Sequence, residues 1–299
     1  MKKVRKVLVV YNPTAGGGRE KVLQRLVDAL VEKSASVEVY RTKAAGDATQ
    51  YLRARSDQGD VVVAVGGDGT TNEVINGLVG GVPLAIMATG TANVLARELS
   101  LPNKPEQVAE LVMSGQLLEI WPGKLNGRRF LMWVGVGYDS WVVNTTDLAL
   151  KRKIGKGAYM VSMLTQIARY GSKRYLITVD GKSYDCYSAI IANARYYGGS
   201  FVLSRYANIA RPSLQALLFM KPGRWTLIKY MLALVLGRME SMDGVVSVAA
   251  QHIEVPDVEG ELLQTDGDAA GALPAVICVD DTPLPILVPE PTGLAFSKV

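Results

Sequence analysis

Short apolar runs alternate with longer stretches of mixed polarity over the first third of the chain. The runs at residues 7–11, 37–41, 61–65 and 83–87 have the length of strands and are rich in apolar residues, most of them β-branched. Between them apolar residues recur at helical spacing, most clearly over residues 22–31. This alternation predicts a parallel sheet with helices on both faces, in which ligands bind at the carboxyl ends of the strands.

The pattern of apolar and polar residues changes at about residue 119. Beyond that point the runs are shorter, and Val, Ile, Tyr and Thr alternate with polar residues and turns. Such a pattern is typical of an antiparallel sandwich or a barrel-like lobe. We therefore predict two domains, an α/β lobe at residues 1–118 and a β-rich lobe at residues 119–288. The tail 289–299 is free to return to the first lobe.

Three loops follow strands of the first lobe, with the sequences NPTAGGGR, GGDGTTNE and ATGTAN. Each leads from a strand toward a helix, where free backbone N–H groups and the helix dipole favour phosphate. One glycine-rich turn would indicate only that glycine accepts a positive φ. Three at equivalent positions predict a phosphate-binding site. None matches the P-loop or the dinucleotide fingerprint, so a different nucleotide-binding mode is required.

The composition limits the kinds of catalytic and metal-binding site that the chain can form. A chain of 299 residues that is 48% hydrophobic can fill two cores. His252 is the one histidine, which excludes multi-histidine metal sites and leaves acid–base chemistry to carboxylates. Cys186 and Cys278 lie in apolar runs, as core cysteines do. The net charge of +5 suits a nucleic acid, an anionic membrane surface or a polyphosphate. We find no hydrolase constellation and no nucleic-acid recognition module.

Four ordered motifs carry a resemblance to a known family. NPTAGGGR, GGDGTTNEVINGL, TGTANVLARELSLP and TDGDAAGALP resemble the landmarks of the diacylglycerol kinase catalytic-domain family. That family of lipid kinases includes soluble bacterial diacylglycerol kinases and the sphingosine and ceramide kinases. NAD kinases and 6-phosphofructokinases share the Gly-Gly-Asp-Gly turn, so the second motif alone is only moderately specific. The resemblance runs from residue 7 to about residue 288.

The resemblance implies a kinase of phospholipid metabolism with an NAD kinase/phosphofructokinase-like α/β lobe and a β-sandwich lobe. It implies ATP and Mg²⁺ in a cleft between the lobes, and transfer of the γ-phosphoryl group to a hydroxyl of a diacylglycerol-like or related lipid. Carried over residue by residue, the nucleotide contacts are Asn12, Pro13, Thr14, Ala15, Gly16, Thr42, Gly66, Gly67, Asp68, Gly69, Thr70, Thr71, Asn72, Glu73, Thr89, Gly90, Thr91 and Asn93.

Three aspartates are the catalytic candidates that the resemblance implies. Asp68 cannot itself favour a phosphate, so its position fits contact with Mg²⁺ through ATP or acceptance of the substrate hydroxyl's proton. The alternative for Asp68 is an Asx residue that stabilises the turn. The family carries Asp-Gly-Glu where this chain has Asp266, Gly267 and Asp268. Either aspartate of this pair could take the proton, while Asp-Gly also predicts a type I′ hairpin turn.

The chain departs from the family pattern at three positions. Val94, Trp121 and Arg211 stand where the resemblance leads one to expect acidic residues, the last of them in a structural Mg²⁺ site. The replacement at Arg211 implies that the structural metal site is lost. Glu119 is the nearby carboxylate that could substitute for the acidic residue missing at Trp121. Two other functions stay open: an NAD-kinase-like kinase of a soluble metabolite, and a non-catalytic sensor of a nucleotide or lipid.

Access to a membrane is expected from the residues and from the resemblance. Residues 150–159, LKRKIGKGAY, set cations beside apolar and aromatic residues, as a peripheral membrane patch does. The apolar segments 159–167 and 225–236 could line an acyl-chain entrance or pack in the core. Because no signal peptide precedes the first strand, we expect a cytoplasmic protein that contacts its lipid substrate peripherally. We expect no nucleic-acid partner, and a homodimer is compatible with the sequence.

Overall fold

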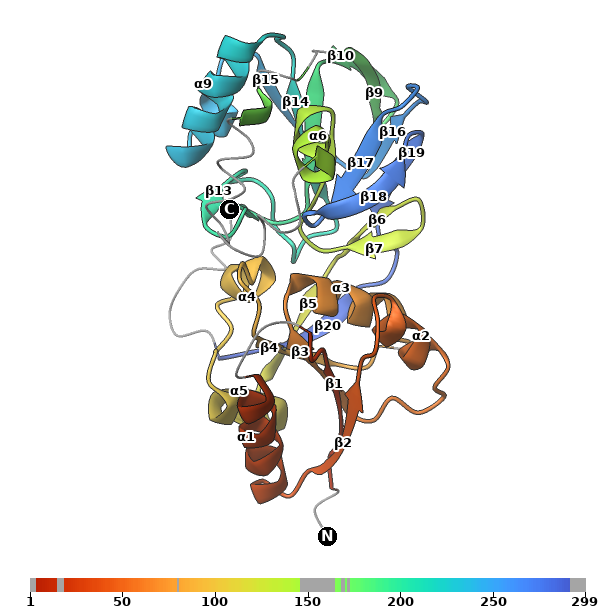
Figure 1. The fold of residues 1–299 in the computed structure, drawn as a ribbon, viewed down its shortest axis with the longest axis vertical. Helices are drawn as coiled ribbons and strands as arrows, with labels where there is room; N and C mark the ends of the chain where they lie inside the picture. Colours follow the sequence, from red (N-terminus) through yellow and green to blue (C-terminus); the bar gives the residue numbers. More distant parts are fainter. Residues whose placement is uncertain are drawn as a thin grey trace. The chain divides into compact units, whose positions relative to one another are not determined.

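The computed structural model describes residues 4–14, 19–79, 81–145, 165–167, 170 and 173–290. It divides the chain into two compact units (Figure 1). The first unit comprises Met1–Ile120 and Pro283–Val299, and the second comprises Trp121–Thr282. The first is an α/β unit and the second a β-sandwich, which confirms the predicted fold class.

The first unit is built on one six-stranded sheet with the order β2-β1-β3-β4-β20-β5. All neighbouring pairs are parallel except β20 with β5. The strands are β1 Lys6–Tyr11, β2 Ser36–Arg41, β3 Val61–Gly66, β4 Leu84–Ala88, β5 Gln116–Ile120 and β20 Leu284–Val288. Each of the first four lies within a residue or two of the apolar run that predicted it.

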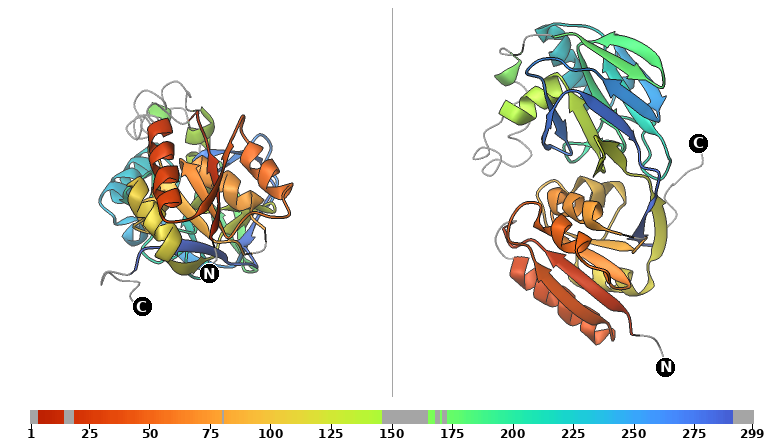
Figure 2. Two further views of the ribbon diagram at one scale, coloured as in Figure 1. Left: turned by 90° about the horizontal axis from the view of Figure 1, so that it is seen from below. Right: turned by 90° about the vertical axis from the view of Figure 1, so that its right-hand side faces the viewer.

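Helices cover both faces of this sheet (Figure 2). One face packs against α1 (Arg19–Glu32) and α5 (Pro105–Ser114), and the other against α2 (Asp47–Arg53) and α3 (Asp68–Gly77). A short helix, α4, spans Val94–Glu98. Strand residues alternate between the faces, and the odd-numbered ones join the α1/α5 core, which includes Val7, Val9, Val61, Val63, Val65, Leu23, Leu26, Leu30, Val108 and Val112.

Strand β20 departs from the prediction of the domain boundaries. The sequence pattern assigns residues 119–288 to the second lobe, whereas β20 and the end of β5 belong to the first unit. β20 fills the position between β4 and β5, pairing with one in parallel and with the other antiparallel. A local apolar pattern identifies a strand but not its distant partner, so the pattern could not place this strand. Residues 291–299 of the predicted tail lie outside the described residues.

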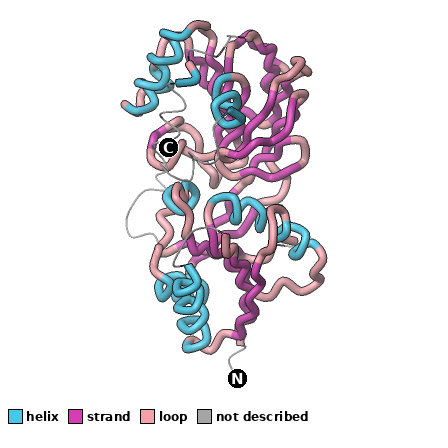
Figure 3. Tube along the Cα trace, viewed as in Figure 1, coloured by secondary structure: helices cyan, strands magenta, loops and turns pink. Residues whose placement is uncertain are grey.

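The second unit contains two six-stranded sheets (Figure 3). Their orders are β10-β9-β16-β19-β6-β7 and β15-β14-β11-β8-β17-β18, and a two-stranded ribbon pairs β12 with β13. The strands are β6 Gly123–Leu125, β7 Arg128–Phe130, β8 Trp133–Val136, β9 Tyr175–Val179, β10 Lys182–Cys186, β11 Ser188–Ala192, β12 Tyr196–Tyr197, β13 Phe201–Val202, β14 Leu214–Phe219, β15 Val245–Ala250, β16 His252–Val255, β17 Leu262–Thr265, β18 Asp268–Ala272 and β19 Ala275–Val279.

The second sheet is buried on both faces along β11. Ala189 and Ile191 point into the sandwich core, together with residues of the opposing sheet such as Ile177. Ser188 and Ile190 point to the other face, where helices α6 (Tyr138–Thr145) and α9 (Arg224–Val235) lie. This double burial explains why the strand reads as a continuous small and apolar run. Among the helices in the described part of the chain, none is both long and apolar enough to cross a bilayer.

Asp280 is a buried carboxylate held between two cations of the second unit. Its Oδ1 lies 2.6 Å from Lys124 Nζ, and its Oδ2 accepts a hydrogen bond from Arg129 Nε. Burial alone would raise the pKa of Asp280, but the hydrogen bonds from Lys124 and Arg129 outweigh it and hold the pKa below its usual value. The cluster joins β6 and β7 to the segment that follows β19.

We expect Asp280→Asn to lower the free energy of unfolding by about 2–3 kcal/mol, because it leaves two partly buried cations without their carboxylate. Asp281→Asn is the matched control, since Asp281 also faces Lys124 but its side chain is 95% exposed. Urea unfolding at pH 7 measures both. Because the pKa of Asp280 is lowered in the folded state, the difference between wild type and Asp280→Asn should shrink as the pH falls below ~4. Equal losses in the two variants would contradict this role for Asp280.

Candidate functional site

The loops that follow β1, β2 and β3 surround a cavity of about 350 Å³ in the first unit. Because β1 pairs in parallel with both β2 and β3, the three strands end at the same edge of the sheet. The residues that line the cavity are Asn12, Thr14, Thr42, Lys43, Ala44, Ala45, Gly67, Gly69, Thr70 and Glu73. All of them except residues 43–45 are among the predicted nucleotide contacts. The structure thus brings residues of two of the three glycine-rich loops to one cavity.

Asn12 connects the loop after β1 to the loop after β3. Its Nδ2 donates to Thr70 Oγ1 at 3.1 Å, and its Oδ1 accepts from the backbone N–H of Thr14 at 3.0 Å. The second bond closes an Asx turn. Asn12 Oδ1 also accepts a hydrogen bond from the Thr14 hydroxyl at 2.8 Å. The backbone N–H of Asn12 donates to the carbonyl of Val65 at 3.1 Å. Asn12 therefore fixes the spacing of two walls of the cavity.

The loop after β4 contacts the loop after β3 directly through the backbone. A Cβ placed on Gly90 would lie 2.6 Å from Gly67 Cα and 2.6 Å from Asn93 Oδ1, so a larger residue would force the loops apart. Beside this contact, Thr89 donates its backbone N–H to the Gly66 carbonyl at 2.7 Å, and Asn93 Nδ2 donates to the Gly90 carbonyl at 2.9 Å. Gly67 and Gly90 are therefore required here for close approach.

Two buried polar atoms at this contact have no hydrogen-bond partner within the described part of the chain. They are Thr89 Oγ1 and Asn93 Oδ1. Buried polar groups are nearly always paired in folded proteins, because an unpaired one has lost its hydration without compensation. Two such atoms lie in the loop that contacts Gly67, a residue of the cavity wall, and they mark this contact as a place where a ligand could supply hydrogen bonds.

Glu73 lines the cavity, but its carboxylate binds backbone groups of α2. Its Oε1 accepts from the N–H of Gly46 at 2.8 Å and its Oε2 from the N–H of Ala48 at 3.2 Å. The first N–H groups of a helix have no partner within the helix, so Glu73 caps α2 from the neighbouring helix α3. This cap holds the loop that carries Thr42 and Lys43 against the rest of the cavity.

Asp68 is the first residue of α3 and follows the N-cap residue Gly67. A carboxylate in the first turn of a helix is stabilised by the helix dipole, which supplies a structural reason for an acidic residue here. The side chain is half-buried, and its two sequence neighbours both line the cavity. Asp68 therefore lies at the border of the cavity, within the first unit.

Asp266 and Gly267 form the turn between β17 and β18 in the second unit. Their φ angles are 52° and 86°, and a type I′ turn needs a positive φ at both central residues. Thr265 faces Asp268 across the hairpin. The hairpin interpretation of the Asp-Gly pair therefore describes the structure, and it leaves Asp268 exposed at the start of β18.

The carboxylate of Asp266 also orders the backbone in front of β8. It accepts hydrogen bonds from the N–H groups of Leu131 at 3.0 Å, Met132 at 2.8 Å and Trp133 at 3.2 Å. The backbone N–H of Asp266 donates in turn to the Trp133 carbonyl at 3.0 Å. With both oxygens engaged by three donors, Asp266 anchors the hairpin to its neighbouring strand.

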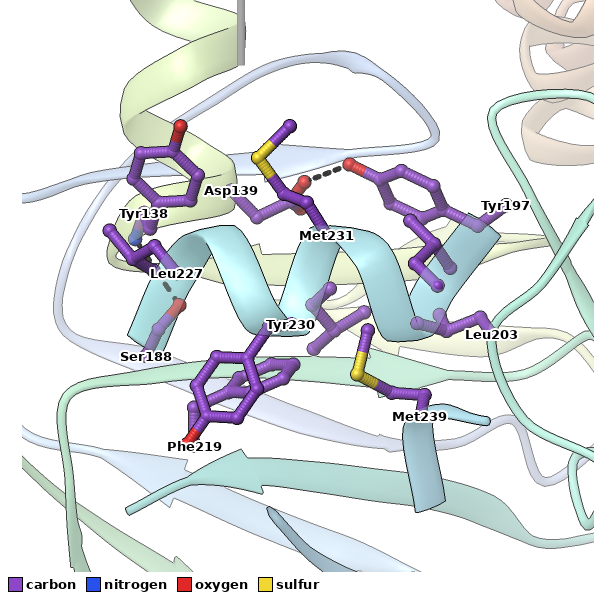
Figure 4. A pocket seen from close by; sticks show the side chains of 12 residues that line it. Tyr138, Asp139, Ser188, Tyr197, Leu203, Phe219, Leu227, Tyr230, Met231 and Met239 are labelled. Carbon is purple, nitrogen blue, oxygen red and sulfur yellow. Dashed lines mark hydrogen bonds between the residues drawn. The ribbon is translucent and has the colours of Figure 1, made fainter. Parts of the chain in front are cut away.

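A second, smaller cavity of about 40 Å³ lies in the second unit between α9, α6 and the sheet (Figure 4). It is lined almost entirely by apolar side chains, including Tyr138, Leu227 and Met231. Asp139 is the acidic residue at this cavity, and Figure 4 shows its carboxylate facing the Tyr197 hydroxyl.

Asp139 is buried, with two hydrogen-bond donors at its oxygens. Tyr197 donates its hydroxyl to Oδ1, and Gln264 donates Nε2 to Oδ2. A Cβ on Gly135 would overlap the Asp139 carboxylate, so the lack of a side chain at Gly135 makes room for the acid. Burial raises the pKa of Asp139 to about 6, and the hydrogen bonds from Tyr197 and Gln264 oppose that rise.

The remaining predicted contacts are spread over the same loops of the first unit. Gly66 ends β3, and Thr71 and Asn72 are buried in α3. Pro13 and Thr91 are exposed. Ala15 and Gly16, and the cationic segment 150–159, lie outside the described residues.

The positions that depart from the family pattern have ordinary structural environments. Val94 is buried as the first residue of α4. The backbone N–H of Trp121 donates to the Ile209 carbonyl at 2.7 Å, and that of Arg211 donates to the Asn208 carbonyl at 2.9 Å. Glu119 is exposed on β5, the edge strand of the first sheet.

Sequence reasoning missed two groups of site residues. Lys43 lines the first cavity, and its position directly after Thr42 at the end of β2 was the signal that could have identified it. Asp139 stands in none of the motifs quoted from the sequence. Its two partners come from segments about 58 and 125 residues further along the chain, and no local pattern links them to it.

Comparisons with known proteins cover both units. Residues 6–125 match the family described as Diacylglycerol kinase catalytic domain, and residues 132–288 match the YegS C-terminal NAD kinase beta sandwich-like domain. A diacylglycerol kinase of Mycobacterium tuberculosis is 28% identical over 299 residues, which cover 95% of this chain and 96% of the relative.

Solved structures share the fold. A crystal structure of a diacylglycerol kinase from Bacillus anthracis superimposes with a TM-score of 0.78 at 26% identity, covering 97% of this chain and 99% of the other. An NAD kinase from Archaeoglobus fulgidus superimposes with a TM-score of 0.55 at 15% identity, covering 95% of this chain and 94% of the other. The second likeness concerns the fold alone.

We expect acidification from pH 7 to pH 5 to stabilise the wild type relative to Asp139→Asn by about 1 kcal/mol. The pKa of Asp139 is about 6 in the folded protein against an ordinary value of 3.8, so the folded state binds the proton more tightly. This stabilisation is fully present below pH ~4 and is lost as the pH rises through ~6. Urea unfolding of both proteins at several pH values measures it. Parallel pH profiles for the two would contradict the raised pKa.

Proposed function

The chain belongs to the diacylglycerol kinase catalytic-domain family and is therefore a kinase of the lipid-kinase type; we propose that it transfers the γ-phosphoryl group of ATP to a hydroxyl group of a diacylglycerol-like lipid. The observation that carries the proposal is the cavity of the first unit, because two of the three loops that surround it are formed by family motifs. The family matches cover both units of the chain.

The first cavity supports the assignment of ATP as the phosphoryl donor. Backbone N–H groups at the start of α3, around Gly67 and Gly69, are suited to phosphate oxygens, and Lys43 adds a cation to the cavity wall. In the adjoining loop after β4, Thr89 Oγ1 and Asn93 Oδ1 are buried acceptors without partners in the described part of the chain, and the amino and hydroxyl groups of a nucleotide are donors that fit them. The residues present therefore fit this ligand.

Mg²⁺ fits as an ion carried by the nucleotide. Asp68 is the carboxylate at the border of the cavity, and within the described residues no three His, Cys, Asp or Glu side chains gather into a metal site. Mg²⁺ is commonly bound by one or two carboxylates together with phosphate oxygens. Asp68 would hold it, and the ion would neutralise charge on the phosphates.

Asp268 is the group that we propose as acceptor of the lipid hydroxyl proton. In the transfer the hydroxyl oxygen bonds to the γ-phosphorus, the bond from that phosphorus to the β–γ bridging oxygen breaks, and ADP leaves. The hydroxyl proton passes to the carboxylate. Asp266 suits this task less well because its oxygens already accept three backbone hydrogen bonds, and it positions the turn that carries Asp268.

The second unit would receive the lipid. Its small cavity of about 40 Å³ is lined mainly by apolar surface of α9 and the sheet, which suits the end of an acyl chain better than a polar substrate. A kinase whose acceptor resides in a bilayer must reach the membrane surface, so we assign it peripheral contact with the membrane from the cytoplasmic side.

The experiment is incubation of the purified chain with γ-labelled ATP, Mg²⁺ and mixed micelles containing diacylglycerol, monoacylglycerol, sphingosine or ceramide, with NAD as a soluble acceptor. We expect label in diacylglycerol or a related lipid, and a loss of at least a hundredfold in Asp68→Asn, because that variant removes the proposed ligand of Mg²⁺. Label in NAD alone would instead identify a soluble-metabolite kinase. ATP binding without label in any acceptor would identify a non-catalytic sensor.

Substitutions of Asp266 and Asp268 should have different effects on activity and on stability. We expect Asp268→Asn to lower kcat by about a hundredfold or more with a smaller change in Tm than Asp266→Ala, because Asp268 is exposed and the amide cannot accept the proton. Asp266→Ala should lower the free energy of unfolding by about 1–3 kcal/mol, because three buried N–H groups lose their acceptor. Thermal unfolding and steady-state kinetics measure both. An Asp268→Asn enzyme with full kcat would move the proton acceptor elsewhere.

A further inference from the structure

Helix α9 is apolar on the face that it turns toward the rest of the second unit. Leu227, Tyr230, Met231 and Leu234 line the small cavity, and Figure 4 shows the first three where the helix crosses it. The intervals of three, one and three residues place these side chains on one side of a helix. This face packs the helix against the sheet and accounts for only part of its apolar residues.

The opposite face of α9 is also apolar, and it is exposed. Trp225 is 79% exposed and Leu232 is 58% exposed, and Ile228, Val235 and Leu236 are exposed as well. At 100° per residue these five side chains form a stripe about 100° wide, turned away from the cavity-lining residues. We call these five residues the outer stripe. Large apolar side chains gathered on a surface mark a place of interaction.

Cations border the outer stripe on both sides. Arg224 and Lys229 are exposed, and at 100° per residue they flank the stripe on either side. Helix α9 contains no carboxylate. Two further exposed cations, Lys221 and Arg238, lie just beyond its ends, the first of them paired with Asp243. An apolar stripe between cations is the pattern of a helix that lies in the interface of an anionic membrane.

We propose that α9 docks on an anionic lipid bilayer, with the outer stripe placed at the boundary between headgroups and acyl chains. The inference rests on the proposed function, in which the acceptor is a bilayer lipid. Charge complementarity favours this occupant over a second copy of the chain. Two copies joined by this face would bring Arg224 and Lys229 of both to one rim, without a carboxylate on either α9 to neutralise them.

The location of α9 would place the apolar cavity next to the membrane on which the helix docks. Its inner face forms a wall of the apolar cavity and its outer face would contact the membrane, so only the width of the helix separates the cavity from the acyl-chain region. A lipid leaving the bilayer at this helix would pass from one apolar surface to another without crossing water, which is the least costly route for an acyl chain.

The test is co-sedimentation of the whole chain with vesicles of phosphatidylcholine alone or mixed with phosphatidylglycerol. We expect binding to the anionic vesicles, weakened by salt, and a loss of at least tenfold in the partition coefficient for Leu232→Glu. Val31→Glu is the matched control, because Val31 is 56% exposed on α1 of the first unit. Equal binding by wild type and Leu232→Glu would overturn the proposal.

A measurement on the wild type covers the case in which Leu232→Glu does not fold. Tryptophan fluorescence is recorded with vesicles that contain brominated acyl chains, which quench only tryptophans that reach them. We expect quenching in the wild type and its loss in Trp225→Phe, because the other described tryptophans are less exposed. Unquenched wild-type fluorescence at saturating anionic vesicle would also overturn the proposal.

The outcomes separate this inference from the proposed function. Vesicle binding that depends on Leu232, without phosphorylation of any lipid, would support the docking of α9 and reject the lipid kinase. Phosphorylation of diacylglycerol with vesicle binding insensitive to Leu232→Glu would do the reverse. A change of oligomeric state in Leu232→Glu, measured by sedimentation, with unchanged vesicle binding would identify a second copy as the occupant and overturn the inference.

Discussion

The backbone contact between Gly67 and Gly90 is the constraint on which the site of the first unit depends. Parallel register brings the ends of β3 and β4 to one edge of the sheet, and the absence of a Cβ lets the two following loops touch. The contact fixes where α3 begins and therefore where its free N–H groups and Asp68 lie. Thr89 Oγ1 and Asn93 Oδ1 are buried beside this contact, without a partner in the described part of the chain. The shape of this site therefore depends on contact between two backbone segments, with no side chain between them.

The sequence predicted the parts of the molecule that depend on local patterns. Apolar runs located the first four strands, and parallel pairing then required their loops to meet, so a site between the loops of Asn12 and Gly67 could be anticipated. Thr42 was predicted only through the family resemblance. Features that depend on distant pairing could not be anticipated. β20 pairs with strands more than 160 residues earlier, and the partners of Asp139 come from two other segments. The same limit hid the three backbone donors that engage Asp266.

Carboxylates in the motifs serve the scaffold as well as the chemistry. Glu73 and Asp266 both stand in motifs that suggested contact with the substrates, yet each accepts hydrogen bonds from backbone N–H groups of another element. Asp68 stands at the start of a helix and is half-buried, and Asp268 stands at the start of a strand and is exposed. An acidic residue within a motif can thus be required because it holds the neighbouring loop in place.

The return of β20 to the first sheet has a consequence for the order in which the units fold. The chain leaves the first unit after Ile120 and re-enters it at Pro283, so the second unit is an insertion within the first. Domains usually fold during synthesis from the amino terminus onward. Here the second unit is continuous in sequence and can complete its fold on the ribosome first. The gap between β4 and β5 is filled only when residues 284–288 emerge, so the unit that begins the chain is the last to be finished.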